Sequence, residues 1–159
     1  MKFLFICTHN RCRSILSESM TNALAGGRIQ AFSAGSQPVG EVHPLTLKYL
    51  AARGYPTRGL QSQSWHEFEA KKPDVVITVC DSAANEACPL WFDEGVKVHW
   101  GLRDPSKIEG SEYEQQAAFF SVMDLIQARV EACLALNLET MPRANRLSAL
   151  ETIARNTTA

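Results

Sequence analysis

The sequence contains no run of apolar residues long enough to cross a membrane. The short apolar segment 3–6 is followed at once by polar and cationic side chains, which is not typical of a signal peptide. An excess of one charge is also lacking, because 16 Lys and Arg stand beside 17 Asp and Glu and the formal net charge is −1. These absences argue against a membrane or a nucleic acid as a partner.

Cysteine pairs with the short spacing of structural zinc sites are missing as well. The five cysteines form an odd set in a chain with no export signal, so we expect reactive thiols and a cytoplasmic protein. A non-catalytic thiol sensor or metal-binding module built on Cys7, Cys80 and Cys88 is the function that these spacings support least. We therefore assign no metal and no cofactor.

The feature that carries most chemistry is the segment from Cys7 to Ser14, which follows the apolar residues 3–6. A cysteine, five further residues and Arg13 allow the backbone to curl around a tetrahedral anion with its N–H groups pointing inward. The guanidinium group of Arg13 can bind two oxygens of that anion. The same positive surroundings are expected to lower the pKa of Cys7, so that its thiolate faces the central atom. The oxyanion-binding residues are then Thr8, His9, Asn10, Arg11, Cys12, Arg13 and Ser14.

Apolar patterns along the chain alternate between strands and helices. The loop is followed by a predicted helix with Ser14 as its candidate N-cap and Gly26-Gly27 as its stop. Residues 75–79 form a β-branched run, which is typical of a strand buried on both faces. The alternation predicts an α/β domain with a parallel sheet flanked by helices. The predicted strands are 2–6, 30–33, 75–79 and 97–100, and the predicted helices are 14–25, 44–53 and 114–136.

Three chemically suitable side chains follow strands of this sheet. Cys7 and Cys80 stand at the carboxyl ends of two different strands, where ligands bind to parallel sheets, so we expect one crevice to hold both. Asp104 follows the fourth strand and precedes a proline. A carboxyl group there can act as a general acid and protonate the leaving oxygen of an anion under thiolate attack. An aspartate that starts a proline turn is the alternative explanation.

Three segments together resemble the low-molecular-weight protein tyrosine phosphatase family. More narrowly, they are similar to the arsenate reductases built on that fold. The resemblance extends over residues 1–136 and implies a four-stranded parallel sheet of flavodoxin-like order. Its segments are the loop Cys7 to Ser14, the turn Ser33-Ala34-Gly35 and the pair Asp104-Pro105.

The resemblance also implies roles for the residues of the loop. By this analogy Cys7 is the nucleophile and Asp104 protonates the leaving oxygen. Arg13 and the loop amides contact the anion, while Asn10 and Ser14 shape the loop and support the thiolate.

Two features favour a reductase over a phosphatase. Ser106 and Lys107 follow the Asp-Pro pair, where the phosphatases usually carry aromatic residues that flank a phosphotyrosine ring. Cys80 and Cys88 are similar to a cysteine pair of the thioredoxin-coupled reductases. In those enzymes the first cysteine of the pair attacks the one that carries arsenic and expels arsenite, and the second then attacks the first. Two-electron reduction needs such a relay, whereas ester hydrolysis does not.

The resemblance therefore implies that this protein reduces arsenate to arsenite. Cys7, Arg13 and Asp104 would carry the first step, and Cys80 and Cys88 would form the intramolecular thiol–disulfide relay. The implied reductant is thioredoxin, or glutathione with glutaredoxin. Hydrolysis of phosphomonoesters on the same loop is the alternative function.

The chain departs from the family pattern in three places. Seven residues separate Cys80 from Cys88, one more than in the best-known reductases. His9 stands in the loop where the family often has a small residue, and we expect its side chain to face solvent. The segment 137–159 lies beyond the usual end of the fold, so we divide the chain into a catalytic part, 1–136, and a helical extension of the same domain, 137–159. The apolar residues that predict the extra helix are Leu147, Leu150 and Ile153.

The resemblance leaves two further roles open. Some members of the family bind potassium at positions that match Asn10, Glu18 and Ser33. Cys12 could protect Cys7 by forming a disulfide, although packing beneath the loop is the favoured role.

Overall fold

A four-stranded sheet in which all neighbouring strands are parallel forms the centre of the molecule. The structure is a computed structural model that describes residues 1–86, 89 and 95–157. The strand order is β2-β1-β3-β4, the flavodoxin-like order, so the predicted fold class is confirmed. The strands are β1 (Lys2–Ile6), β2 (Gln30–Ala34), β3 (Val75–Thr78) and β4 (Val96–His99).

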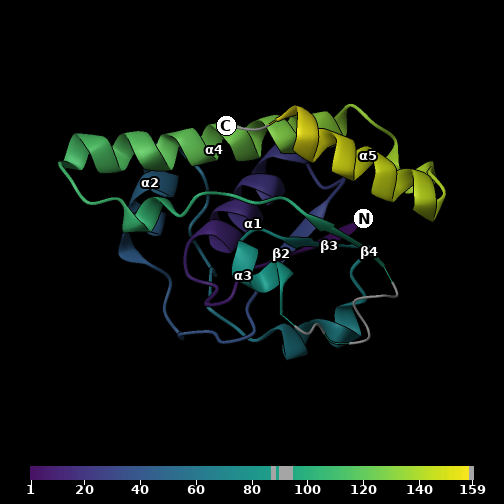
Figure 1. Ribbon diagram of the computed structural model, residues 1–159, viewed down its shortest axis with the longest axis horizontal. Coiled ribbons are helices and arrows are strands. Elements are labelled where there is room, and N and C mark those ends of the chain that lie inside the picture. The colour runs from purple at the N-terminus through teal and green to yellow at the C-terminus, as the bar shows by residue number, and fades with distance from the viewer. Residues whose placement is uncertain (87–88, 90–94, 158–159) are drawn as a thin grey trace.

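Helices connect the strands and flank the sheet. In the view of Figure 1, α4 and α5 lie along one side of the molecule and the strands lie beneath them. The α-helices are α1 (Arg13–Leu24), α2 (Pro44–Ala52), α3 (Asp81–Ala84), α4 (Glu112–Leu134) and α5 (Arg143–Asn156). The short 3-10 helices are η1 (Trp65–Lys71), η3 (Pro105–Lys107) and η4 (Leu138–Thr140).

The start of α1 differs from the sequence prediction. Cys12 occupies the N-cap position and makes no side-chain cap, whereas Ser14 lies inside the helix. The prediction of Ser14 as N-cap is therefore wrong, because its hydroxyl accepts a hydrogen bond from the Asn10 side chain of the preceding loop, 2.8 Å away. The predicted stop is confirmed, since Gly26 and Gly27 both have positive φ angles directly after the helix.

The long helix α4 packs its apolar stripe into the core, as its pattern predicts. Phe119 is fully buried and lies against Tyr49 of α2, with ring centroids 4.8 Å apart. The stripe also carries Arg129, which the sequence pattern did not identify as buried. Its side chain is almost entirely enclosed. Among the described residues, no helix is long and apolar enough to cross a membrane.

The C-terminal helix α5 packs on β4 and on α4. The indole N–H of Trp100 donates to the carbonyl oxygen of Leu150 at 3.0 Å. Arg129 donates from Nε to Thr157 at 3.1 Å and from its terminal nitrogen to the carbonyl oxygen of Gly101 at 3.3 Å. These contacts attach the segment after residue 137 to the loop that follows β4.

We predict that Leu150→Ala lowers the free energy of unfolding by about 2–5 kcal/mol, because Leu150 is fully buried and its truncation leaves a cavity beneath α5. Urea unfolding followed by circular dichroism measures the change. Ser148→Ala, an exposed position on the same helix, is the control and should alter stability by no more than about 0.5 kcal/mol. Equal stability of the two variants would contradict the packing of α5.

Candidate active site

A pocket of about 310 Å³ lies at the carboxyl ends of β1, β3 and β4. The parallel sheet brings Cys80 and Asp104 there beside Cys7 and Arg13 of the first loop, as the strand-end argument predicts. A second pocket of about 290 Å³ lies near the beginnings of β3 and β4 and has no cysteine among its lining residues. Cys88 lies outside the described residues. The residues that line the first pocket are Cys7, Thr8, His9, Arg11, Cys12, Arg13, His43, Cys80, Ser82, Asp104, Ser106 and Lys107.

The loop between β1 and α1 directs its carbonyl groups away from this pocket toward neighbouring segments. The carbonyl oxygen of Thr8 accepts from the amide of Gln37 at 2.9 Å, and that of Arg11 accepts from the amide of His43 at 2.9 Å. The C=O and the following N–H of a trans peptide point in opposite directions. The next amides in the loop therefore point into the pocket, the arrangement of an anion-binding nest.

Asn10 holds the middle of the loop in this shape. Its φ angle is +48°, a left-handed conformation that alternates with the right-handed residues of a nest. The buried side chain donates to Ser14 at 2.8 Å and to Ser33 at 3.0 Å, and it accepts from the amide of Gln63 at 2.8 Å. One side chain thus connects the loop to α1, to β2 and to the segment before η1.

Gly35 lets the loop lie directly against the turn after β2. A Cβ atom at this position would stand 2.6 Å from the carbonyl oxygen of Cys7 and 2.5 Å from that of Thr8. Both are main-chain atoms of the loop, so neither can rotate away. The glycine of the Ser33-Ala34-Gly35 turn is required by this close approach.

Arg13 and Asp104 lie together at the rim of the pocket. Arg13 donates to the carbonyl oxygen of Leu102 at 3.1 Å, and its guanidinium lies 3.6 Å from the Asp104 carboxylate. The Nε–H of Arg13 is buried and has no hydrogen-bond partner among the described residues. A buried donor without a partner is costly, and an oxyanion bound in the pocket would satisfy it. The other Asp104 oxygen accepts from the amide and hydroxyl of Ser106, at 3.0 and 2.6 Å.

Cys7 and Cys80 both line the pocket, and a hydrogen bond between their thiols shifts the pKa of each. This hydrogen bond lowers the pKa of Cys80 to about 5, and amide donors from Ala83 and Thr8 add to the effect. The same hydrogen bond and burial raise the pKa of Cys7, although Arg13 acts in the opposite direction. The pair therefore loses its first proton easily and holds its second firmly.

The charge distribution of this pair differs from the sequence prediction. The sequence places the thiolate on Cys7 alone, because only Arg13 and the loop amides are visible as local partners. The structure places a second thiol in the same pocket, and the first negative charge belongs to the pair, with Cys80 as its favoured position.

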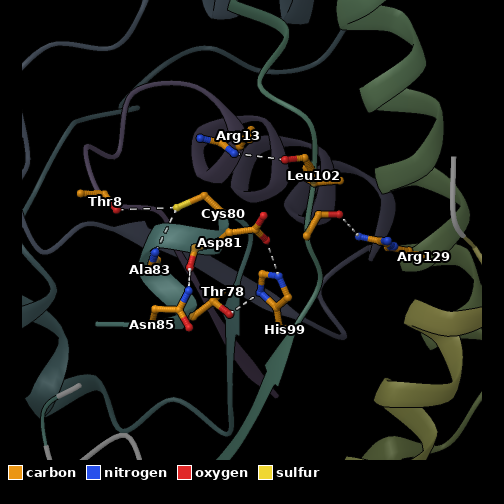
Figure 2. A network of polar contacts seen from close by, with 11 residues as sticks. Thr8, Arg13, Thr78, Cys80, Asp81, Ala83, Asn85, His99, Leu102 and Arg129 are labelled. Carbon is orange, nitrogen blue, oxygen red and sulfur yellow. Dashed lines mark hydrogen bonds and ion pairs between the residues drawn. The ribbon is translucent and has the colours of Figure 1, made fainter. Parts of the chain in front are cut away.

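Cys80 also caps the short helix α3. Its sulfur accepts from the amide of Ala83 at 3.4 Å and lies 3.7 Å from the hydroxyl oxygen of Thr8. Figure 2 shows the sulfur between these two groups. The first residue of α3, Asp81, pairs with His99 at 3.1 Å, and His99 in turn contacts Thr78 at 2.8 Å. No local pattern in the sequence indicates these contacts, because their partners come from other segments of the chain.

The remaining loop residues differ in exposure. His9 is exposed as predicted, and Arg11 is exposed too. Cys12 is buried, and burial raises its pKa to about 12, which suits packing beneath the loop rather than reactivity. All cysteines that the structure describes are free thiols. His43 lines the pocket and caps α2 by accepting from the amide of Leu45, a role that the sequence analysis did not identify.

The acidic residue Glu18 lies behind the loop and accepts a hydrogen bond from Ser33. Burial raises the pKa of Glu18 to about 7, against the opposing effect of that hydrogen bond. The potassium site implied by the resemblance would use Asn10, Glu18 and Ser33. Glu18 and Ser33 offer oxygens of the kind that a hard cation binds, whereas Asn10 presents its amide N–H to Ser33 and its oxygen to the amide of Gln63. A cation held there would favour the charged form of Glu18 and strengthen the support of the loop.

Residues 2–144 match the family of low molecular weight phosphotyrosine protein phosphatases, and the chain belongs to that family. Among its curated relatives is an arsenate reductase of Halalkalibacterium halodurans, which is 34% identical over 80% of this chain and 90% of the relative. A glutaredoxin arsenate reductase of Synechocystis is 31% identical over 84% of this chain and 96% of the relative. The solved structure of a thioredoxin-dependent arsenate reductase from Corynebacterium glutamicum has a TM-score of 0.63 and 25% identity, and covers 84% of this chain and 59% of that one.

We predict that Gly35→Ala weakens the binding of inorganic phosphate by roughly 10²-fold, because the new methyl group displaces the loop and small displacements in such sites are costly. Isothermal titration calorimetry measures the affinity. Gly59→Ala is the control: it has open space around its Cβ, so it should cost about 1–2 kcal/mol of stability for its positive φ and leave phosphate binding unchanged. Equal phosphate affinity in the two variants would contradict the close approach.

We predict that the buried carboxyl group of Glu18 makes the free energy of unfolding depend on pH. Its pKa lies at about 7 in the folded protein against 4.5 ordinarily, so the folded state keeps a proton that the unfolded chain has released. The resulting stabilisation is complete below the unfolded value and is lost as the pH rises through the folded value. Between pH 5 and 8 the free energy of unfolding of the wild type should fall by up to about 3 kcal/mol relative to that of Glu18→Gln. Urea titrations across that range measure the free energy of unfolding, with the exposed Glu69→Gln as control. If the free energies of wild type and Glu18→Gln changed in parallel with pH, the prediction would be contradicted.

Proposed function

We propose that this protein reduces arsenate to arsenite with two of its own thiols as the electron source. The observation that carries the proposal is that Cys7 and Cys80, which follow two different strands, line one oxyanion pocket together with Arg13. Hydrolysis of an ester needs one nucleophile, whereas two-electron reduction also needs a second thiol to complete a disulfide. Curated relatives named arsenate reductase over most of the chain support the same conclusion.

The first step would use the loop, Arg13 and Asp104. Arsenate has the tetrahedral shape and charge of phosphate, and the loop amides and the buried Nε–H of Arg13 suit its oxygens. The proton of Cys7 passes to the Cys80 thiolate, so that the negative charge of the pair moves to Cys7. The thiolate of Cys7 then attacks arsenic, a sulfur–arsenic bond forms and one arsenic–oxygen bond breaks. The leaving oxygen departs as water, protonated by Asp104 at the rim of the pocket.

The second step would use Cys80. Its thiolate attacks the sulfur of Cys7, the disulfide forms and the sulfur–arsenic bond breaks. The electron pair of that bond stays on arsenic, which leaves as arsenite. Two thiols are thereby oxidised to one disulfide and arsenic gains two electrons, so the step is balanced.

Regeneration would move the disulfide outward. In our proposal Cys88 attacks Cys80 and releases Cys7, and an external thiol donor reduces the Cys80–Cys88 disulfide. Cys80 caps α3 through the amide of Ala83, so a new bond to Cys88 would remove that cap and loosen this single helical turn. The donor is a thiol protein of the thioredoxin or glutaredoxin class, the two named among the relatives. Free thiols at the centre of the chemistry fit a cytoplasmic protein.

One assay separates this function from phosphomonoester hydrolysis. Arsenate-dependent oxidation of NADPH is followed with the thioredoxin system and then with glutathione, glutaredoxin and glutathione reductase. Hydrolysis of a small aryl phosphate is measured on the same preparation. NADPH oxidation with one donor system supports the proposal. Rapid ester hydrolysis with no arsenite formed would overturn it, and Cys7→Ser should abolish both activities.

Two variants separate the first step from the second. Asp104→Asn should slow the attack of Cys7 on the anion by roughly 10²–10⁴-fold, the usual effect of a lost general acid. Cys80→Ser should block the release of arsenite but retain hydrolysis of the aryl phosphate, because only the second step needs the Cys80 sulfur as a nucleophile. Rapid-quench measurement of arsenite release distinguishes the effects of the two variants. Normal turnover of the Cys80→Ser protein would remove Cys80 from the mechanism.

A further inference from the structure

The hydroxyl group of Thr8 lies between the sulfur of Cys80 and the carboxylate of Glu86. Thr8 donates its hydrogen bond to Glu86 at 2.7 Å, and its oxygen lies 3.7 Å from the Cys80 sulfur. A hydroxyl group has a single proton. Since that proton is directed at Glu86, the Thr8 oxygen is placed to accept a hydrogen bond from Cys80 whenever the Cys80 thiol carries its proton. The three groups thus form a chain along which protons can move in one direction, from thiol to carboxylate.

The second step of the proposed reaction needs such a chain. Cys80 must lose its proton before it can attack, because the thiolate is the nucleophile. In the free protein Cys7 supplies the hydrogen bond that most favours the thiolate of Cys80. Once Cys7 is bonded to arsenic, its sulfur has no proton and this support is lost. Cys80 is only 3% exposed, so bulk water is a poor substitute.

We propose that Glu86 is the proton acceptor for Cys80 and acts through the Thr8 hydroxyl. This inference rests on the proposed function and names the residue that prepares its second step. The Cys80 proton passes to the Thr8 oxygen, the Thr8 proton passes to the Glu86 carboxylate, and the Cys80 thiolate then attacks the sulfur of Cys7. No external acid, base or oxidant is needed.

The product of this transfer is stabilised by the same groups. The Thr8 hydroxyl now donates to the thiolate, and the amide of Ala83 donates to it at 3.4 Å. The negative charge moves from Glu86 to Cys80, so the net charge of the pocket does not change. A charge that is moved rather than created costs less in a partly buried site.

A purely electrostatic role for Glu86 predicts the opposite behaviour. A fixed negative charge near Cys80 disfavours the thiolate, so its removal would make Cys80 more acidic and speed the second step. A proton acceptor, when removed, slows that step. The direction of the effect of Glu86→Gln therefore distinguishes the two roles, because glutamine keeps the size and can still accept from Thr8 but cannot take up a proton.

The first experiment measures a single turnover without external reductant. Reduced protein is mixed with arsenate, and arsenite release is followed by rapid quench in the wild type, Glu86→Gln and Glu151→Gln, an exposed acid on α5 that serves as the charge-matched control. We expect Glu86→Gln to slow release by roughly 10²-fold, the low end for a lost base. Its hydrolysis of a small aryl phosphate should stay unchanged, and so should both activities of the control. Thr8→Val should slow arsenite release as Glu86→Gln does, and Thr8→Ser should restore release.

The second experiment needs no arsenate and therefore tests the proton transfer even if the proposed function fails. Iodoacetamide alkylation of Cys80 is followed by peptide mass spectrometry in Cys7→Ala protein, with and without Glu86→Gln. As long as Glu86 is ionised, transfer of the Cys80 proton to it adds a route to the thiolate that does not depend on the pH of the solvent. With Glu86 present, the rate should therefore level off as the pH falls, whereas with glutamine it should fall about tenfold per pH unit. Faster alkylation of the glutamine variant at every pH, or identical profiles, would overturn the proposal.

Discussion

The orientation of the peptide planes between β1 and α1 is the constraint on which the rest of the site depends. The loop carbonyls are held outward by the amides of Gln37 and His43, and this turns the intervening N–H groups into the pocket. The Asn10 side chain and the missing Cβ of Gly35 let two other segments pack against the loop from behind. An oxyanion site of this kind is built from main-chain dipoles, and the surrounding side chains serve mainly to hold those dipoles in place.

Two thiols that share a proton give this pocket its redox character. A single cysteine in such a loop is a nucleophile, and its surroundings need only favour its thiolate. Because Cys7 and Cys80 line the same pocket, their titrations are coupled, so that charge on one sulfur suppresses charge on the other. This coupling suits a sequence of two attacks, in which Cys7 reacts first and Cys80 must be activated only afterward.

The loop after β4 is held from two sides. Arg13 donates to the carbonyl oxygen of Leu102, and Arg129 donates to that of the neighbouring Gly101. Figure 2 shows the two arginines approaching this loop from opposite directions. Arg129 also bonds to Thr157 at the end of α5. The C-terminal helix is therefore connected, through one buried guanidinium, to the segment that carries Asp104.

Local patterns were sufficient for the strands, the main helices and the cysteine–arginine loop, because each depends on residues that are neighbours in the chain. The β-branched residues of β3, the glycine stop after α1 and the spacing of Cys7 and Arg13 are of this kind. Tertiary contacts decided the rest. Ser14 is not an N-cap because Asn10 uses its hydroxyl, and Arg129 is buried because α5 folds back over it. The proton chain through Thr8 joins residues 78 positions apart, and only the packing of parallel strands places them within hydrogen-bonding distance.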